Sequence, residues 1–317
     1  MLLFKTIKLP IHIKRKKTAI GLHRAAGYHR KRKRPNKKMI IAAAAVFVAL
    51  YGIKNIGGAK NNNTKEDIKT PVQESAFSVE SGAYIESGLL NEADLMNIKT
   101  GVRLKMDGSP EILIFHTHSS EGYADGGTGE KATVIDAGNA LAEIISDTYG
   151  VGVVHDVSAY DMLDGRTSTE GSYERSEEGV RKLLNKYPGI KVLIDIHRDS
   201  FNGSETNTAD YNGRDSARLM LVNGVCALDN NGQKADAGVE NPYISENISL
   251  SLKLKKAMDS AAPDIMKNVY IKPYRYSLNI MPCSLLLEAG NENNTIDEVK
   301  NSLYPFASAL FNVLEEN

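Results

Sequence analysis

The sequence predicts an α/β fold, with a mostly parallel, twisted sheet that carries helices on both faces. Short apolar runs of strand length alternate with longer segments in which apolar residues recur at helical spacing. Strands separated by helical segments are typical of parallel sheets, because a parallel connection needs a long crossover. A basic arm and one apolar run precede this region, so we also expect a single N-terminal transmembrane helix and a linker.

The predicted elements follow one another from residue 110 onward. Runs such as ILIF (residues 112–115) are continuously apolar, which suits strands covered on both faces. Glycine and proline, which stop helices, follow two of the helical segments at Gly150 and Pro188. The expected strands cover residues 111–116, 151–156, 191–199, 217–225, 266–272 and 283–290, and the expected helices cover residues 91–98, 137–149, 176–187, 241–260 and 298–314.

The charged residues are strongly segregated along the chain. Residues 1–38 hold 14 lysines and arginines and no acidic residue, although the whole chain has 39 basic and 39 acidic residues. The rest of the chain is therefore net acidic. The basic arm abuts the apolar run 39–53, and basic residues beside an apolar span stay on the cytoplasmic side of a membrane. We expect a basic cytoplasmic tail at 1–38 and a transmembrane anchor at 39–56.

The remaining chain is predicted to lie outside the cytoplasm. No small-residue cleavage motif follows the apolar run, which favours an uncleaved anchor. Polar residues rich in Asn, Lys and Gly come next, so residues 57–108 are expected to be a linker or stalk before a catalytic domain at 109–317. Cys226 and Cys283 are the only cysteines and lack CxxC spacing, so neither a thiolate metal site nor a disulfide framework is expected.

Metal-ligand residue types follow several of the predicted strands. His116 and His118 follow ILIF, His155 follows VGVV, His197 follows VLIDI, and Glu288 follows CSLLL. In open α/β sheets ligands bind beyond the carboxyl ends of the strands. Imidazoles and carboxylates without thiolates are ligands that a catalytic zinc ion uses. We therefore expect a zinc site at this edge of the sheet.

The sequence indicates roles for individual residues at this edge and leaves some alternatives open. One of His116 and His118 is expected to bind the metal directly, with Glu121 as third ligand or as its hydrogen-bonding partner. Arg198, next to His197, can hold a substrate carboxylate or stabilise an oxyanion. Asp195 and Asp199 flank His197, and either can orient its ring. Glu288 is expected to be the general base. Metal residues are thus His118, His197, Glu121 and His116, and catalytic residues Glu288 and Arg198.

Five segments of the chain resemble a known family, that of stage II sporulation protein P. They are FHTHSSEGY (115–123), VHD with SYERS (154–156 and 172–176), DIHRDS (195–200) and LLLEAGNENNT (285–295). The resemblance covers about residues 110–316 and the anchor-and-linker layout. It implies a peptidoglycan hydrolase of the sporulating septum, with a fold similar to that of zinc N-acetylmuramoyl-L-alanine amidases. Such an enzyme cuts the amide between muramic acid and the stem peptide, and is also credited with cutting stem cross-links.

The resemblance also implies roles, cofactor and partners. His118 resembles the first zinc histidine of the amidases, His197 the second, and Glu288 the catalytic glutamate, with Zn²⁺ as cofactor. The amidases take a glutamate ligand from the start of their first helix, and residues 136–139 offer none. Glu121 or His116 takes its place. Stage II sporulation proteins D and M are the implied partners, and the intermembrane space of the sporulation septum is the implied location.

Three other functions are compatible with parts of the sequence. An HxH metal-dependent phosphoesterase or amidohydrolase is one alternative, but the usual HxHxDH extension is absent, since the chain continues Ser119, Ser120, Glu121. A non-catalytic cell-wall-binding scaffold with a relict metal site is another. Nucleic-acid binding by the basic tail is the third, and the position of that tail beside the apolar run favours a membrane role instead.

Overall fold

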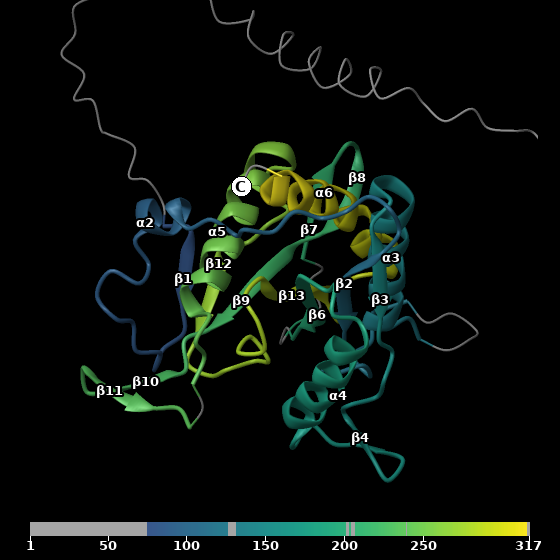
Figure 1. Cartoon of the computed structure of the whole chain (residues 1–317). Helices are drawn as coiled ribbons and strands as arrows, with labels where there is room; N and C mark the ends of the chain where they lie inside the picture. Colours follow the sequence, from purple (N-terminus) through teal and green to yellow (C-terminus); the bar gives the residue numbers. More distant parts are fainter. Residues whose placement is uncertain (1–74, 126–130, 201–202, 204–206, 239, 316–317) are drawn as a thin grey trace, which may run out of the picture. The chain divides into compact units, whose positions relative to one another are not determined.

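The computed structural model describes residues 75–125, 131–200, 203, 207–238 and 240–315 (Figure 1). The predicted basic tail at 1–38, the anchor at 39–56 and the linker up to residue 74 lie outside the described residues. Within the described part, none of the helices has the length and apolar character needed to cross a membrane.

A seven-stranded sheet forms the centre of the fold (Figure 1). Strands β13, β6, β2 and β3 are parallel to one another, whereas β9 is antiparallel to β13, and β12 and β1 run parallel to β9. The prediction of a mostly parallel sheet is confirmed. The spatial order is β1 (Phe77–Val79), β12 (Val269–Lys272), β9 (Leu219–Gly224), β13 (Ser284–Asn291), β6 (Val192–Asp199), β2 (Pro110–Phe115) and β3 (Gly152–His155).

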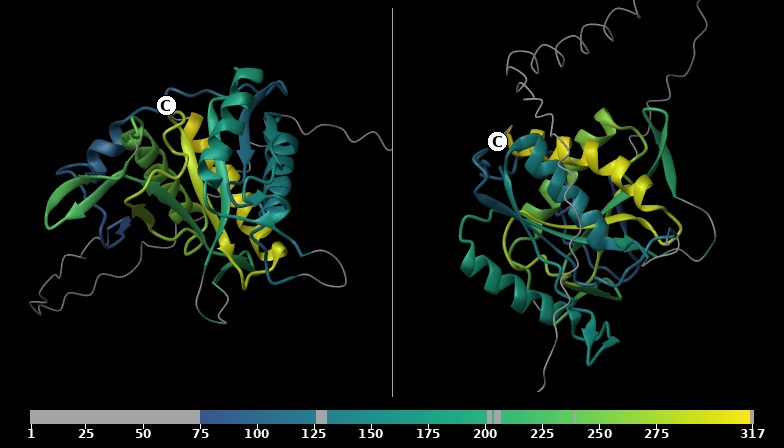
Figure 2. Two further views of the ribbon diagram at one scale, coloured as in Figure 1. Left: turned by 90° about the horizontal axis from the view of Figure 1, so that it is seen from below. Right: turned by 90° about the vertical axis from the view of Figure 1, so that its right-hand side faces the viewer.

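Helices cover both faces of the sheet, as predicted (Figure 2). On β2, Ile112 and Ile114 are buried in one cluster with residues of α3 (Val134–Tyr149), α5 (Ile244–Ala261) and α6 (Ile296–Glu315). Leu113 and Phe115, which alternate with them, pack on the other face with Val180 of α4 (Ser172–Lys186). This two-residue period decides which site residue faces which helix.

The α3 helix begins three residues before the predicted start at residue 137. Thr133 caps it, with its hydroxyl accepting a hydrogen bond from the Ile135 N–H, 3.3 Å away. Asp136 accepts in return from the Thr133 N–H at 2.8 Å. These reciprocal bonds form a capping box, which satisfies N–H groups that the first turn leaves without partners.

Residues 75–108, which the sequence analysis assigns to the linker, contain two elements of the folded body. Strand β1 extends the sheet by pairing with β12. The short helix expected at 91–98 is confirmed as α2 (Glu92–Asn97), capped by Asn91. Phe77 and Leu95 are buried against Ile248 of α5. A three-residue strand such as β1 is too short to give a clear periodic signal.

Three hairpins were not predicted, although their turns carry a strong sequence signal. They turn at Asp164-Gly165, Asn212-Gly213 and Asn231-Gly232, where both residues have positive φ. Such Asn-Gly and Asp-Gly pairs favour the tight turns of two-residue hairpins. The hairpins are β4–β5 (Met162–Leu163 and Arg166–Thr167), β7–β8 (Thr208–Tyr211 and Arg214–Ala217) and β10–β11 (Ala227–Asn230 and Gln233–Asp236). Cys226 and Cys283 are both buried, and no disulfide joins them.

A close backbone contact fixes the loop after β12. A Cβ atom added to Gly224 would lie 1.9 Å from the Tyr274 carbonyl oxygen. We expect Gly224→Ala to lower the free energy of unfolding by about 1–3 kcal/mol, because neither backbone segment can yield freely. Urea unfolding measures this. Gly122→Ala is the control, since its added Cβ would meet nothing closer than 3.6 Å. Equal stabilities of the two variants would contradict the close contact.

Candidate active site

The side-chain alternation of β6 and β13 brings the predicted residues to one face of the sheet. On β6, Leu193 packs on the α4 side, so Asp195 and His197 point to that side too. On β13, Glu288 lies directly beside His197 in the parallel register. The structure therefore brings together the two residues that the sequence places at the ends of separate apolar runs.

His118 lies against His197 across the end of β2. The two ring centroids are 5.3 Å apart, and the Nδ1 atom of His118 is buried without a hydrogen-bond partner. The turn that follows His118 is held by Asp161, which accepts from the Ser119 hydroxyl at 2.8 Å and from the Ser120 N–H at 3.0 Å. A buried nitrogen without a partner is unfavourable unless a ligand completes it.

Glu121 lies at the end of that turn, and its side chain also approaches His197. Its Oε2 atom lies 3.6 Å from the Nδ1 atom of His197 and accepts a hydrogen bond from the Arg198 N–H at 2.9 Å. Two imidazoles and one carboxylate thus converge on the α4 side of the sheet. Of the alternatives left open by the sequence, the structure places Glu121 beside His118 and His197.

A buried carboxylate, Asp195, lies behind His197. Its Oδ1 atom is 3.0 Å from the Nε2 atom of His197, although the two groups are not aligned for a regular hydrogen bond. Asp195 also accepts from the Thr117 N–H at 2.9 Å and from its hydroxyl at 2.6 Å. The sequence left Asp195 and Asp199 as equal candidates for orienting the ring. The structure selects Asp195, since Asp199 instead pairs with Lys267 at 3.1 Å.

Burial and the neighbouring charges shift the pKa values of His197 and Asp195 in opposite directions. Burial alone would lower the pKa of His197, but the nearby carboxylates of Asp195 and Glu121 outweigh it and raise the pKa well above its usual value. Burial would raise the pKa of Asp195, and the charge of His197 and the hydrogen bonds from Thr117 hold it below the usual value. Without a metal ion, the pair is therefore favoured as imidazolium and carboxylate.

Glu288 has no such partner. Its Oε2 atom is buried without a hydrogen bond, and burial raises the pKa of this carboxyl to about 7. A carboxyl group that titrates near neutrality can take up a proton and give it back at physiological pH. This property suits the predicted general base.

His116 does not join the site. It follows Ile112 and Ile114 in the alternation of β2 and therefore points toward α3, away from His197. Both ring nitrogens are engaged, Nδ1 with the Ile196 carbonyl oxygen at 3.0 Å and Nε2 with the Nε2 atom of His155 at 2.8 Å. Burial lowers the pKa of His116 to about 4, which keeps the ring neutral.

Arg198 also points away from His197, because the two are neighbours on the same strand. Its guanidinium donates to the Gly122 carbonyl oxygen at 3.1 Å and lies 3.5 Å from Glu292. The predicted role in holding an oxyanion therefore has no geometric support. Through its backbone N–H and its guanidinium, Arg198 instead fixes the turn that carries Glu121.

The donor set fits zinc in its chemistry. His118, His197 and Glu121 are nitrogen and oxygen donors of the kinds that a catalytic zinc ion takes, and the orphaned Nδ1 atom of His118 faces no competing partner. Asp195 behind His197 supplies the carboxylate that commonly orients a ligating histidine. In the described residues, however, no three such side chains are already arranged as a metal-binding group.

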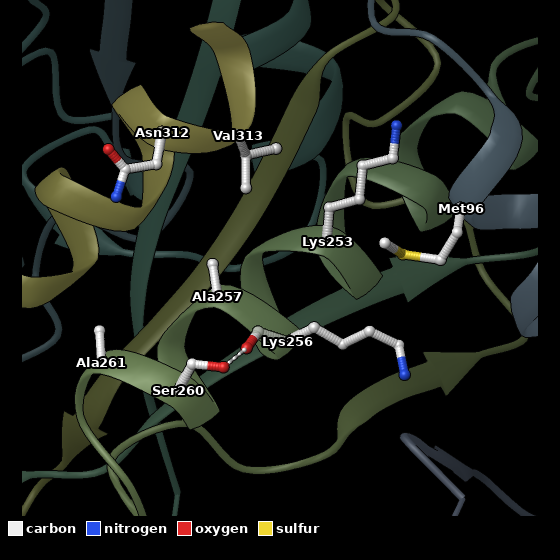
Figure 3. Close-up of a pocket in the computed structure, with 8 residues that line it drawn as sticks. All are labelled: Met96, Lys253, Lys256, Ala257, Ser260, Ala261, Asn312 and Val313. Carbon is white, nitrogen blue, oxygen red and sulfur yellow. Dashed lines mark hydrogen bonds between the residues drawn. The ribbon is translucent and has the colours of Figure 1, made fainter. Parts of the chain in front are cut away.

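A separate hollow lies far from these residues. It opens between α2, α5 and α6 and is lined by Met96, Lys253, Ala257 and Val313, among others (Figure 3). Both lysines of its lining are already engaged, since Lys253 donates to the Ile98 carbonyl oxygen and Lys256 pairs with Glu92 at 2.7 Å. No group with catalytic chemistry lines it.

Comparison with known proteins shows a family model that matches most of the chain. The family model described as Stage II sporulation protein P matches residues 17–311. Stage II sporulation protein P of Bacillus subtilis (strain 168) is 25% identical over 210 residues, which cover 60% of this chain and 48% of that protein. The chain thus spans about half the length of this curated relative.

Two solved amidase structures are also similar. The N-acetylmuramoyl-L-alanine amidase AmiC2 of Nostoc punctiforme shares 14% identity at a TM-score of 0.37, over 66% of this chain and 98% of that one. The CwlD amidase from Clostridioides difficile, solved in complex with the GerS lipoprotein, shares 13% identity at a TM-score of 0.39, over 65% and 97%.

The raised pKa of Glu288 predicts a pH-dependent gain in stability when its charge is removed. The folded protein favours the neutral carboxyl, whereas the unfolded chain ionises it above about pH 4.5. The free energy of unfolding of the metal-free protein therefore falls as pH rises from about 4.5 to about 7, and it remains at the lower value above pH 7. We expect Glu288→Gln to raise the free energy of unfolding at pH 8 by on the order of 3 kcal/mol, and to change it little at pH 4.

Urea unfolding in the presence of a chelator measures both values. Glu178→Gln is the matched control, because Glu178 is exposed and pairs only with Lys182 on the surface. A Glu288→Gln variant no more stable than the wild type at pH 8 would show that the carboxyl is not buried and unpartnered.

Proposed function

We propose that this chain, which belongs to the stage II sporulation protein P family, is a peptidoglycan hydrolase with zinc-dependent N-acetylmuramoyl-L-alanine amidase activity. We further propose that the N-terminal segment anchors it in the membrane, with the catalytic body in the intermembrane space of the sporulation septum. Stage II sporulation proteins D and M are its proposed partners. The observation that carries the enzymatic proposal is the unpartnered, buried Glu288 beside the His118–His197–Glu121 cluster.

Three side chains would hold the metal. They are His118 and His197 through their Nδ1 atoms, and Glu121 through its carboxylate. A zinc ion there supplies Lewis acidity, which polarises a carbonyl group and makes water more acidic. Asp195 keeps the Nε2 side of the His197 ring occupied, so that Nδ1 faces the cluster.

Glu288 moves the proton. Its carboxylate takes a proton from the attacking water, whose oxygen forms a bond to the amide carbonyl carbon between N-acetylmuramic acid and the stem peptide. The C–N bond then breaks, and Glu288 passes the same proton to the leaving amine. The carboxylate is regenerated, so proton and charge balance over the cycle. The same chemistry extends to peptide bonds in the stem cross-links, which is the proposed endopeptidase activity.

Two substitutions separate metal binding from proton transfer. His197→Ala should lose bound zinc, measured by elemental analysis of the purified protein, because one of three ligands is removed. Glu288→Gln should keep zinc and yet release no stem peptide from purified sacculi, measured by mass spectrometry of the soluble products. Stem-peptide release by Glu288→Gln at the wild-type rate would refute the proposed role of Glu288.

The two aspartates around His197 give a matched pair. Asp195→Asn should weaken zinc affinity about 10- to 100-fold, because the ring loses the carboxylate that orients it. Asp199→Asn should leave the affinity within about twofold, since Asp199 contacts Lys267 instead. Competition with a zinc-binding dye measures both. The proposal fails for Asp195 if the two variants bind zinc equally well.

A further inference from the structure

A row of tyrosine rings begins at the candidate site and leads from α4 to the loop that follows β12. Tyr173, the second residue of α4, packs edge-on against His118 with centroids 5.5 Å apart. Tyr276 follows at 5.7 Å from Tyr173, and Tyr274 follows at 6.3 Å from Tyr276. Tyr173 and Tyr276 are partly buried, whereas Tyr274 is 55% exposed. The row thus connects the catalytic cluster to the surface.

The loop that carries Tyr274 and Tyr276, residues 273–282, is held firmly in place. Gly224 lets its backbone approach closely at Tyr274. Asn247 donates to the Leu278 carbonyl oxygen at 2.8 Å, and Arg275 pairs with Glu177 of α4 at 3.1 Å. A loop tied to a strand, to α5 and to α4 presents its rings in one arrangement.

Two consecutive residues of this loop have an unfavourable backbone conformation. Tyr276 and Ser277 both have φ of 53°, in the left-handed region that bulky side chains rarely adopt. Ser277 is buried, and its hydroxyl lies 3.4 Å from that of Ser176 on α4. Strained residues of this kind persist where the surrounding structure imposes them, and they cluster at binding sites. The strained backbone here carries the Tyr276 ring, which lies 5.7 Å from that of Tyr173.

Polar groups lie along the margin of the row. The Lys272 ammonium is 5.4 Å from the ring centroid of Tyr270 and 5.5 Å from that of Tyr276. Glu80, which follows β1, has a buried Oε2 atom without a hydrogen-bond partner, and its charge adds to the effect of burial in raising the pKa of both phenols. The row therefore combines aromatic faces with a cation and a free acceptor.

This combination suits a carbohydrate better than a protein partner. The C–H groups of a pyranose ring carry partial positive charge and pack on the negative face of an aromatic ring, while the sugar hydroxyls need polar partners at the edge. A protein interface would instead bury a contiguous apolar core. Here the exposed ring of Tyr274 lies next to the ring of Tyr276, which in turn lies beside the Lys272 ammonium.

We propose that Tyr173, Tyr276 and Tyr274 form a saccharide-binding subsite that holds a chain of N-acetylated amino sugars beside His118. The inference rests on the proposed function, because it assigns the part of the enzyme that holds the glycan of its substrate. Tyr274 stacks on a sugar ring at the open end of the row, and Glu80 accepts a hydrogen bond from a sugar hydroxyl.

Binding of a hexamer of N-acetylglucosamine tests the subsite, measured by isothermal titration calorimetry on the full chain. The hexamer carries no stem peptide and no scissile muramoyl amide, so its binding is independent of hydrolysis. Tyr274→Ala should weaken binding about tenfold, because a stacking ring is removed. Tyr274→Phe should bind within about twofold of the wild type, because the ring face is kept.

Tyr304→Ala is the matched control. Tyr304 is 59% exposed on α6, which covers the opposite face of the sheet, and its loss should leave binding unchanged. The subsite is refuted if the wild type does not bind the hexamer, or if Tyr274→Ala binds as tightly as Tyr304→Ala. Equal losses in Tyr274→Ala and Tyr274→Phe would also refute ring stacking.

The two proposals can fail separately. If Glu288→Gln still releases stem peptide but the hexamer binds through Tyr274, the catalytic proposal fails and the subsite stands. If Glu288→Gln is inactive while Tyr274→Ala hydrolyses sacculi with an unchanged KM and binds the hexamer normally, the subsite fails and the catalytic proposal stands.

Discussion

The buried carboxylate of Asp195 joins the ends of two strands, and the geometry of the site depends on it. It accepts two hydrogen bonds from Thr117 just beyond β2 and lies against His197 on β6. Charge-assisted bonds of this kind are shorter and stronger than neutral ones. By fixing Thr117 toward α4, they leave His116 on the α3 side and bring His118 out beside His197. The position of the Asp195 carboxylate thus favours His118, and not His116, as the histidine that lies beside His197.

The same burial that orders His197 makes Glu288 unfavourable in the folded protein. The carboxyl group is buried, and its Oε2 atom has no hydrogen bond. Asp195 avoids this penalty by pairing with Thr117 and His197, whereas Glu288, one strand away, does not. The fold thus holds two buried carboxyl groups in different states: Asp195 has hydrogen-bonding partners, and Glu288 has none at its Oε2 atom. The two groups are therefore suited to different functions. One carboxylate orients a ligand, and the other remains free to exchange a proton.

Much of this arrangement was predictable from the sequence, and the rest was not for identifiable reasons. The strand at ILIF and the helices at 137–149 and 298–314 were predicted because their apolar residues recur with a clear period. The segment at 75–108 was assigned to the linker because β1 is too short to show a period, and one short helix at 91–98 did not by itself indicate a folded body. The hairpins at Asp164, Asn212 and Asn231 have a turn signal in their Asp-Gly and Asn-Gly pairs, but their strands of two to four residues show no hydrophobic period.

The site shows the same division. That His197 and Glu288 lie close together was predictable, because each follows an apolar strand. The choice between His116 and His118 was not, because it depends on the residue at which β2 ends. Selecting Asp195 over Asp199 depended on the contacts of the two carboxylates, because both alternate with His197 on β6 and only Asp199 pairs with Lys267. Only the direction of Arg198, away from the cluster, depended on which face of β6 a residue occupies. The tyrosine row gave no sequence signal, because Tyr173 lies about a hundred residues from Tyr274 and Tyr276, and only the fold brings them together.

The most direct test of the central claim is the position of zinc in crystals of the protein, located by anomalous scattering at the zinc absorption edge. We expect one peak at about 2 Å from the Nδ1 atoms of His118 and His197 and from the Glu121 carboxylate, with Glu288 close by but not bound to it. A peak at His116 and His155, or none at the His118–His197–Glu121 cluster, would contradict the account.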